Sequence, residues 1–200
     1  PMARLKIGLL GGSFNPAHEG HLHISLLALK QLRLDQVWWL VSPQNPLKAT
    51  EGMAPLADRL ASARAMARHP AIHASDLESR LGTRYTVDTL GALQKHWPEH
   101  AFVWLMGADN LVQLPRWRRW TEIVETMPMA IFNRSDQGHT SGGHRALAGA
   151  AATRYARYRV LRPATLADAK APAWCFLFSP LHLASSTAIR AETAKLPKEA

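Results

Sequence analysis

Two histidines near the start of the chain, His18 and His21, have the residue type and spacing that chemistry on phosphates requires. Residues three apart lie on one side of a helix, so both imidazoles would face the same way on a first helical turn. Such a pair can donate hydrogen bonds to phosphate oxygens and stabilise the charge that develops on them. The pair follows Gly11-Gly12, and glycines let backbone amides approach an anion closely. We therefore predict a phosphate-binding site in this segment.

The histidine pair has two other interpretations, a zinc site and a helix cap. His18-Glu19 begins the zinc motif H-E-x-x-H, but the second histidine would fall at Leu22, and no cysteine lies nearby. The segment also lacks the common phosphate loops G-x-x-x-x-G-K-[ST] and G-x-G-x-x-G. Two histidines that merely cap a surface helix are the remaining alternative, and the glycine turn before them favours a site.

The composition is typical of a globular protein with an anionic partner. Of the 200 residues, 47% are hydrophobic and 20% are charged, which is enough to bury a core. The net charge of +9 does not distinguish nucleic acids from nucleotides. A single cysteine, Cys175, excludes a disulfide framework, and its apolar surroundings predict a buried thiol. The sequence lacks an apolar stretch of about 18 residues, so we expect a cytoplasmic protein without membrane contact.

Strands that alternate with helices must position the histidines. An apolar run at 6–10 predicts a strand, and Leu22, Leu26, Leu29 and Leu32 predict an apolar stripe on the helix that begins near His18. Residues 37–41 are continuously apolar, as in a strand buried on both faces of a parallel sheet. The histidines therefore fall at the end of a strand, where open α/β sheets bind their ligands.

The alternation continues along the chain. Helices are predicted near 56–67, from 86, at 109–114 and at 117–125, and strands near 72, at 101–106 and at 129–132. The glycine-rich stretch 135–149 predicts a surface loop. Late strand candidates are 158–161 and 174–178, and a final helix is predicted at 185–195. The fold class is thus α/β, a doubly wound, Rossmann-like parallel sheet in a single domain of residues 1–200.

The segment 11–22, which lies at the end of the first predicted strand, resembles the HxGH nucleotidyltransferase superfamily. Its form G-G-S-F-N-P-x-H-x-G-H-L is similar to bacterial nicotinate-nucleotide adenylyltransferases, which usually have aspartate at the position of Asn15. Adenylyltransferases that make dephospho-coenzyme A usually have threonine at the position of His18, so they match less well. The resemblance implies a nucleotidyltransferase-type sheet with a small C-terminal part, from about 155 to 200, that carries a second phosphate motif.

Further segments resemble the family in the same order along the chain. The segment 83–90 resembles S-Y-T-x-D-T-L. The segments 107–110 and 114–117 resemble G-x-D and L-P-x-W, and the segment 185–190 resembles S-S-T-x-I-R. The isolated positions Lys48 and Arg134 match the family as well. Leu47 stands where the family often has histidine, and Ser135-Asp136 replace its Pro-Gly. Each segment also has a plain structural interpretation: a helix cap at Ser186 or Thr86, and a core position for Trp117.

The resemblance implies a role for each of these residues. The catalytic pair would be His18 and His21. ATP would be bound by Gly11, Gly12, Ser13, His18, His21, Gly107, Asp109, Arg134, Ser186, Thr187 and Arg190. Nicotinate mononucleotide would be bound by Ser13, Phe14, Lys48, Tyr85, Thr86 and Trp117.

The implied reaction is adenylyl transfer from ATP to nicotinate mononucleotide, which gives deamido-NAD and pyrophosphate in NAD biosynthesis. Mg2+ would arrive with ATP, and we expect no dedicated metal site. Nicotinamide mononucleotide and phosphopantetheine are alternative acceptors. A different alternative is a nucleic-acid-binding module, suggested by the net charge and by the basic and aromatic runs at 116–120 and 154–159. We favour solvated helix faces for these runs and expect no nucleic-acid partner.

Overall fold

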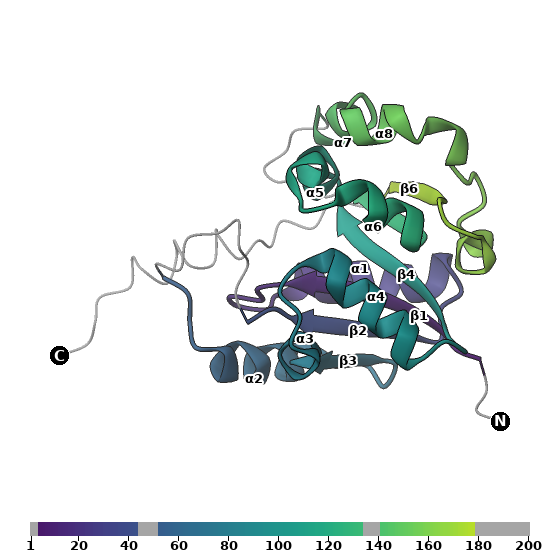
Figure 1. Cartoon of the computed structure of the whole chain (residues 1–200). Coiled ribbons are helices and arrows are strands. Elements are labelled where there is room, and N and C mark those ends of the chain that lie inside the picture. The colour runs from purple at the N-terminus through teal and green to yellow at the C-terminus, as the bar shows by residue number, and fades with distance from the viewer. Residues whose placement is uncertain (1–3, 44–51, 134–140, 179–200) are drawn as a thin grey trace.

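A single parallel sheet organises the computed structural model, which describes residues 4–43, 52–133 and 141–178 (Figure 1). In this part of the chain six strands pair in the order β3-β2-β1-β4-β5-β6, and every neighbouring pair is parallel. The strands are β1 (Lys6–Gly12), β2 (Gln36–Val41), β3 (Ile72–Ser75), β4 (Ala101–Gly107), β5 (Met129–Asn133) and β6 (Trp174–Phe178). This order is that of a doubly wound sheet, so the predicted fold class is confirmed.

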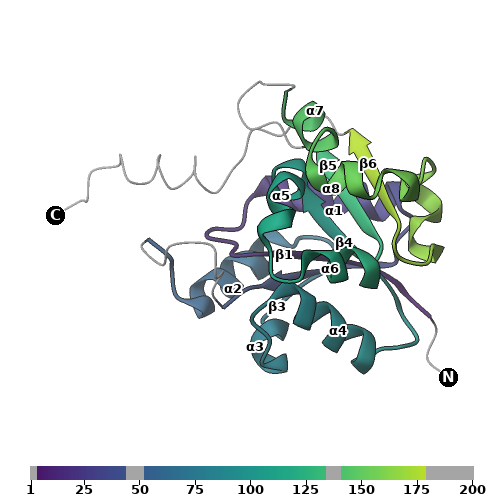
Figure 2. The same cartoon turned by 45° about the horizontal axis from the view of Figure 1, so that its top comes forward.

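Helices cover both faces of the sheet. In Figures 1 and 2, α1 lies behind the sheet, whereas α4 and α6 lie in front of it. The helices are α1 (Glu19–Gln31), α2 (Leu56–Met66), α3 (Leu77–Leu81), α4 (Thr86–His96), α5 (Ala108–Gln113), α6 (Trp120–Thr126), α7 (Ser141–Leu147) and α8 (Ala150–Arg154), with 3-10 turns η1 (Leu114–Arg116), η2 (Ala156–Tyr158) and η3 (Pro163–Asp168).

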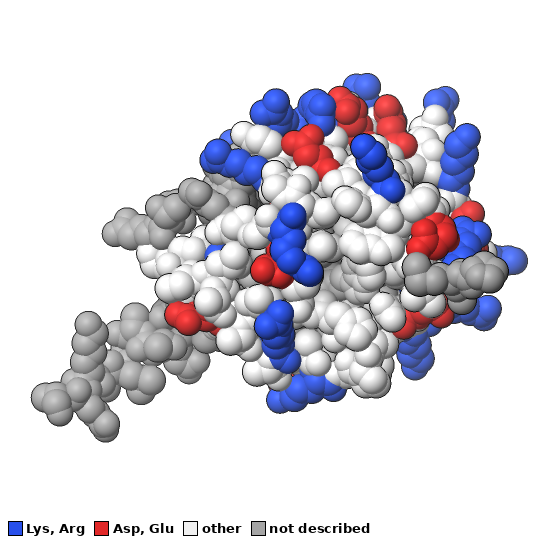
Figure 3. All heavy atoms as spheres, turned by 60° about the horizontal axis from the view of Figure 1, so that its bottom comes forward, with Lys and Arg blue, Asp and Glu red and all other residues white. Residues whose placement is uncertain are grey.

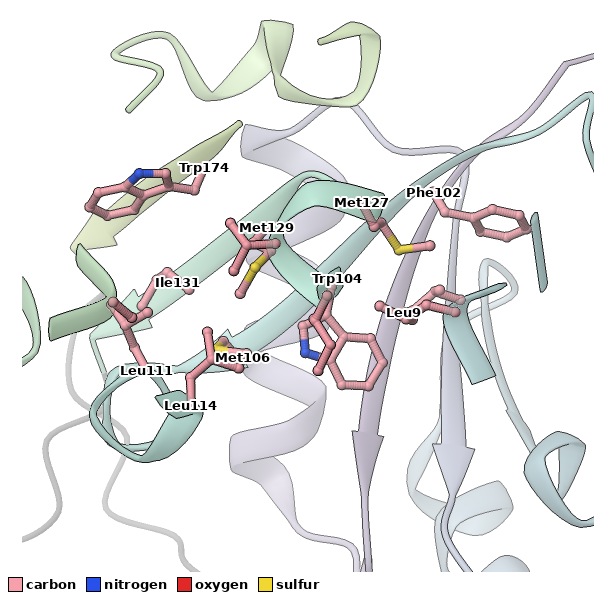
Figure 4. Close-up of a cluster of buried hydrophobic side chains, with 14 of the residues drawn as sticks. Leu9, Phe102, Trp104, Met106, Leu111, Leu114, Met127, Met129, Ile131 and Trp174 are labelled. Atoms are coloured by element: carbon pink, nitrogen blue, oxygen red, sulfur yellow. The ribbon is translucent and has the colours of Figure 1, made fainter. Parts of the chain in front are cut away.

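The two-residue period of the strands divides the core into two clusters, one on each face. In β4, Trp104 packs with α4, α5 and α6, and the next residue, Leu105, packs with α1. In β5 the neighbours Met129 and Ala130 divide in the same way. Figure 4 shows the first cluster, where side chains from β1, β4, β5 and β6 meet those of α5 and η1. Central strands buried on both faces therefore account for the continuous apolar runs in the sequence.

The predicted leucine stripe on the first helix is partly wrong. Leu22 and Leu32 are buried, but Leu26 is 40% exposed, and Ser25 and Ala28 face the sheet instead. These small residues let the helix approach the sheet closely, and the buried Ser25 hydroxyl accepts a hydrogen bond from the Trp39 indole at 2.7 Å. A polar residue thus lies on the packed face because it has a buried partner.

Other elements also differ from prediction. The predicted loop 135–149 contains α7, and the predicted strand at 158–161 is absent from the described residues, where only an isolated bridge joins Arg159 to Trp174. The helices α3 and α8 were not predicted, and each has five residues, too few to show helical periodicity. The helix predicted at 185–195 lies outside the described residues.

The prediction for Cys175 is confirmed, because the thiol is 1% exposed and burial raises its pKa to about 12. A thiol with this pKa is not a nucleophile at neutral pH. Over the described ranges, no helix is long and apolar enough to cross a membrane.

Candidate active site

The candidate site lies where the strand order reverses, at the carboxyl ends of β1 and β4. The chain runs outward from β1 to β2 and β3 on one side, and β4, β5 and β6 extend the sheet on the other. Loops that leave adjacent strands in opposite directions open a crevice between them, which is the usual ligand site of such sheets. At this point β1 ends in Gly11-Gly12, and a Cβ atom on Gly11 would lie 2.5 Å from Cη2 of Trp104. Glycine is therefore required by the close approach of β1 to this indole.

The two predicted histidines lie side by side at the start of α1. Their ring centroids are 3.8 Å apart. His18 is the N-cap, with an extended backbone, and its Nδ1 accepts a hydrogen bond from the Gly20 amide at 3.1 Å. His21, the third helical residue, accepts from the His18 amide through its own Nδ1 at 3.2 Å. The alternative that these residues cap a helix is thus correct, and it does not compete with a role in a site.

This reciprocal cap fixes the chemistry of both imidazoles. Because Nδ1 accepts a hydrogen bond in each ring, the neutral imidazole carries its proton on Nε2. Each Nε2 is therefore a hydrogen-bond donor, as a phosphate oxygen requires. The helix start adds backbone amides and the positive end of the helix dipole next to these donors.

The aromatic rings of Phe14 and Trp39 pack against the ring of His21. The Phe14 ring lies 4.6 Å from the His21 ring and 5.2 Å from the Trp39 ring, and it is 1% exposed. The Trp39 indole donates to Ser25, whose hydroxyl donates in turn to the backbone oxygen of His21 at 2.8 Å. The ring of Phe14 therefore supports the histidines, and only its backbone can reach a ligand.

A pocket of about 340 Å³ opens beside the glycine turn. It collects seven of the predicted site residues, namely Gly11, Gly12, Ser13, Tyr85, Thr86, Asp109 and Trp117. Trp117 is half-buried and packs against the core, as its structural interpretation predicts, and it also lines the pocket; its role toward a ligand stays a prediction. Segments that lie far apart in the sequence thus converge on one hollow at the carboxyl edge of the sheet.

The part of the pocket near α4 combines aromatic rings with cationic groups. The Arg118 guanidinium lies 4.6 Å from the centre of the Tyr85 ring. Tyr85 is the N-cap of α4 and makes no side-chain cap hydrogen bond, so the expectation that Thr86 caps this helix is wrong. Amides at the start of α4 and the Arg118 side chain make this end of the pocket suitable for an anionic group on a flat ring.

Glu78 adds a carboxyl group to the pocket wall. It is 6% exposed, and burial raises its pKa, although hydrogen bonds from the hydroxyls of Ser42 and Thr89 act in the opposite direction. The Thr89 hydroxyl lies 3.2 Å from Oε1 of Glu78 and 2.8 Å from the hydroxyl of Thr83. This network joins the end of β2, α3 and the start of α4.

Several predicted site residues are placed outside this pocket. Gly107 ends β4 and is the N-cap of α5, two residues before the lining residue Asp109 of that helix. The histidine pair follows Ser13 along the chain and does not line the pocket itself. Five predicted residues lie outside the described part of the structure, and they are Lys48, Arg134, Ser186, Thr187 and Arg190.

Sequence reasoning missed other residues of the pocket wall. Ser42 directly follows β2, so the rule that ligands bind at strand ends could have identified it. Arg84 and Arg118 flank predicted residues and could have been found as their neighbours. Glu78 carried no signal, because it lies in the short helix α3 that the sequence did not predict.

Among the described residues, no group of three or more His, Cys, Asp or Glu side chains could hold a metal ion. The basic and aromatic runs have local partners: Arg119 pairs with Asp88 at 2.7 Å, and Tyr155 of the second run is buried with Arg154 close to its ring. On the face shown in Figure 3, Lys and Arg side chains are spread over the surface, and Asp and Glu side chains lie near several of them. These contacts fit solvated helix faces better than a nucleic-acid surface.

Comparison with known proteins places the chain in a family. The cytidylyltransferase-like family model matches residues 9–192. A relative from Parvibaculum lavamentivorans, named "Probable nicotinate-nucleotide adenylyltransferase", is 56% identical over 93% of this chain and 91% of its own length. A protein of the same name from Cereibacter sphaeroides is 55% identical over 92% of this chain and 96% of its own.

A solved structure shares the fold at low sequence identity. It is the nicotinic acid mononucleotide adenylyltransferase of Plasmodium falciparum complexed with NaAD, with a TM-score of 0.67 and 16% identity over 92% of this chain and 82% of that one. The fold, the order of the motifs and these relatives agree. The chain belongs to the nicotinate-nucleotide adenylyltransferases of the cytidylyltransferase-like family.

Proposed function

We propose that this protein transfers the adenylyl group of ATP to nicotinate mononucleotide, which yields deamido-NAD and pyrophosphate. The observation that carries the proposal is the pair of imidazoles whose caps leave Nε2 as the donor, at the strand ends beside a pocket with aromatic and cationic walls. The names of the close relatives support the same reaction. The reaction needs no enzyme nucleophile, because the phosphate of the mononucleotide attacks the α-phosphorus of ATP directly.

Catalysis would then consist of positioning and charge stabilisation. Two anions must be held in line against their repulsion, and negative charge grows on the α-phosphoryl oxygens and on the leaving pyrophosphate. His18 and His21 are proposed to donate from Nε2 to these oxygens. The amides of Gly11, Gly12 and Ser13 would bind neighbouring phosphate oxygens, because glycines admit them closely.

Further residues are proposed to complete the nucleotide site on the basis of the family resemblance. Asp109, which lines the pocket, would accept hydrogen bonds from ribose hydroxyls, with Gly107 two residues before it. Ser186, Thr187 and Arg190 would hold the β- and γ-phosphates, and Arg134 would also bind ATP.

The acceptor is proposed to occupy the end of the pocket near α4. Trp117 offers an indole on which a pyridine ring can stack. The hydroxyl and amide groups of Tyr85 and Thr86 would bind the carboxylate of the ring, and Ser13, the backbone of Phe14 and the ammonium of Lys48 would bind the acceptor phosphate. The Arg118 guanidinium would attract the carboxylate of nicotinate, whereas the amide group of nicotinamide is neutral. This end of the pocket would therefore favour nicotinate over nicotinamide.

Mg2+ is proposed to enter as part of the ATP complex and to neutralise charge on the phosphates. The described carboxylates of the pocket wall are Glu78 and Asp109. Glu78 is engaged with hydroxyl groups, so the wall does not offer the cage of several carboxylates that a resident ion requires.

A comparison of acceptors tests the proposed function. Purified protein is mixed with ATP, Mg2+ and one acceptor at a time, and pyrophosphate release and the dinucleotide product are measured. We expect nicotinate mononucleotide to give the highest kcat/KM and nicotinamide mononucleotide a lower one. A higher kcat/KM with phosphopantetheine, or salt-sensitive nucleic-acid binding without transfer, would replace the proposal.

A further inference from the structure

A buried arginine with an unusual set of partners lies directly behind the glycine turn. Arg59 of α2 is 2% exposed. Its guanidinium donates four hydrogen bonds, all to backbone oxygens: from Nε to Ala54 at 2.9 Å, from Nη1 to Ser13 at 2.6 Å and Ser42 at 2.7 Å, and from Nη2 to Pro43 at 3.0 Å. A buried arginine is usually paired with a carboxylate, so this arrangement requires an explanation.

The four acceptors come from the segments that form the mouth of the site. Ser13 directly follows β1, Ser42 and Pro43 follow β2, and Ala54 precedes α2. Ser13 and Ser42 also line the pocket. Arg59 therefore fixes the relative positions of two loops that leave the sheet at the ligand-binding edge.

Asn15 strengthens the same connection. Its side chain donates to the backbone oxygen of Gly52 at 3.0 Å and accepts from the Ala54 amide at 3.2 Å. An aspartate, which the family usually has here, could accept from Ala54 but could not donate to Gly52. Arg59 and Asn15 thus share Ala54 as an anchor point, and this chain uses a neutral side chain beside its buried cation.

Among the described residues, the hydrogen-bond acceptors of the Arg59 guanidinium are all backbone carbonyl oxygens. None of the ion pairs among the described residues includes Arg59. Burial lowers its pKa from the ordinary value, but a guanidinium still remains protonated at neutral pH. A positive charge next to the glycine turn attracts an anion that binds there.

We propose that Arg59 is a positioning residue for adenylyl transfer. It fixes the ends of β1 and β2 in the geometry that binds polyphosphate, and its positive charge adds to the attraction for that anion. This inference rests on the proposed function. Two variants separate its parts, because Arg59→Lys keeps the charge but loses the forked donor, and Arg59→Met loses both. Arg64→Met is the matched control, because Arg64 lies on the same helix and is exposed.

The experiment measures the thermal unfolding midpoint, the Kd of pyrophosphate by calorimetry, and kcat and KM for both substrates well below that midpoint. For Arg59→Met we expect pyrophosphate to bind about tenfold more weakly and kcat/KM to fall about a hundredfold. For Arg59→Lys we expect pyrophosphate affinity within about threefold of the unsubstituted protein but a kcat lower by about tenfold. Arg64→Met should match the unsubstituted protein in all these values.

A purely structural role predicts a different pattern. It lowers the unfolding midpoint but leaves kcat and pyrophosphate affinity of the folded variants unchanged, and this result would overturn the proposal. If Arg59→Met does not fold, Arg59→Lys decides: a loss in kcat of more than about fivefold supports the proposal, and a smaller loss overturns it. If neither variant folds, Arg59 serves stability alone and the proposal is also overturned. Failure of the unsubstituted protein to adenylylate nicotinate mononucleotide would refute the proposed function instead. The Kd of pyrophosphate for the Arg59 variants would then still test the role of Arg59 in anion binding.

Discussion

Replacing His18 by asparagine separates the two roles that the structure gives this residue. Nδ1 of His18 caps α1 through the Gly20 amide, whereas Nε2 is the proposed donor to phosphate. An asparagine side chain can provide an acceptor near the position of Nδ1 and is a favoured N-cap, but it has no atom at the position of Nε2. The variant should therefore keep the start of the helix and lose the phosphate contact.

The expected size of each effect follows from these contacts. Loss of one preorganised donor to a developing oxyanion costs about 3 kcal/mol of barrier, which is roughly a hundredfold in kcat. Loss of the cap, as in His18→Ala, costs about 1 kcal/mol, or roughly 2–4 °C in unfolding midpoint for a chain of this length. We therefore expect both variants to lose about a hundredfold in kcat and only His18→Ala to lose the additional stability of the cap.

Pyrophosphate release and thermal unfolding are measured for both variants, with His96→Asn as the control. His96 is an exposed imidazole at the C-terminal end of α4, the opposite end of that helix from the pocket residues Tyr85 and Thr86. A His18→Asn variant that unfolds like the unsubstituted protein and retains kcat/KM within about threefold would refute the role of Nε2.

Three further predictions concern the pocket and the strand beneath it. Trp117→Leu should raise KM for nicotinate mononucleotide roughly three- to tenfold with little change in KM for ATP, because a stacking surface is lost; steady-state kinetics check this, and equal changes in both KM values would contradict it. Burial raises the pKa of Glu78, so its contribution to stability is present at low pH and is lost as pH rises through that pKa. The unfolding midpoint of Glu78→Gln minus that of the unsubstituted protein should consequently rise by a few degrees as pH increases from about 5 to about 8. A difference that does not change with pH would contradict this. Gly11→Ala should destabilise the fold by about 1–3 kcal/mol in denaturant unfolding because its Cβ would clash with Trp104, whereas Gly12→Ala, with its nearest contact at 3.5 Å, should cost less; equal costs would argue against the clash.

The sequence identified the elements whose hydrophobic pattern is long and the motifs that lie at their ends. The central strands were predictable because both faces are buried, and the histidine pair because it follows a glycine turn at a strand end. Trp117 and Tyr85 could be assigned to one site only through the family resemblance, since nothing in their local sequence shows that they line the same pocket.

The remaining features depend on tertiary contacts that no local pattern encodes. The leucine stripe of α1 was misplaced because Ser25 finds a buried partner in Trp39, and a helical period cannot reveal such a partner. Arg59 carries no local signal of its role, because its four carbonyl partners come from three separate segments. A charged residue becomes a buried anchor only when loops converge on it, and that convergence is visible only in the folded chain.

The central claim is direct transfer of the adenylyl group between two bound nucleotides, with no group of the enzyme as nucleophile. The stereochemical course at the α-phosphorus tests it most directly, with a single diastereomer of adenosine 5′-O-(1-thiotriphosphate) as donor and nicotinate mononucleotide as acceptor. One in-line displacement predicts a dinucleotide product with inverted configuration at phosphorus. Retention of configuration in that product would reveal an adenylylated enzyme intermediate and would contradict the account.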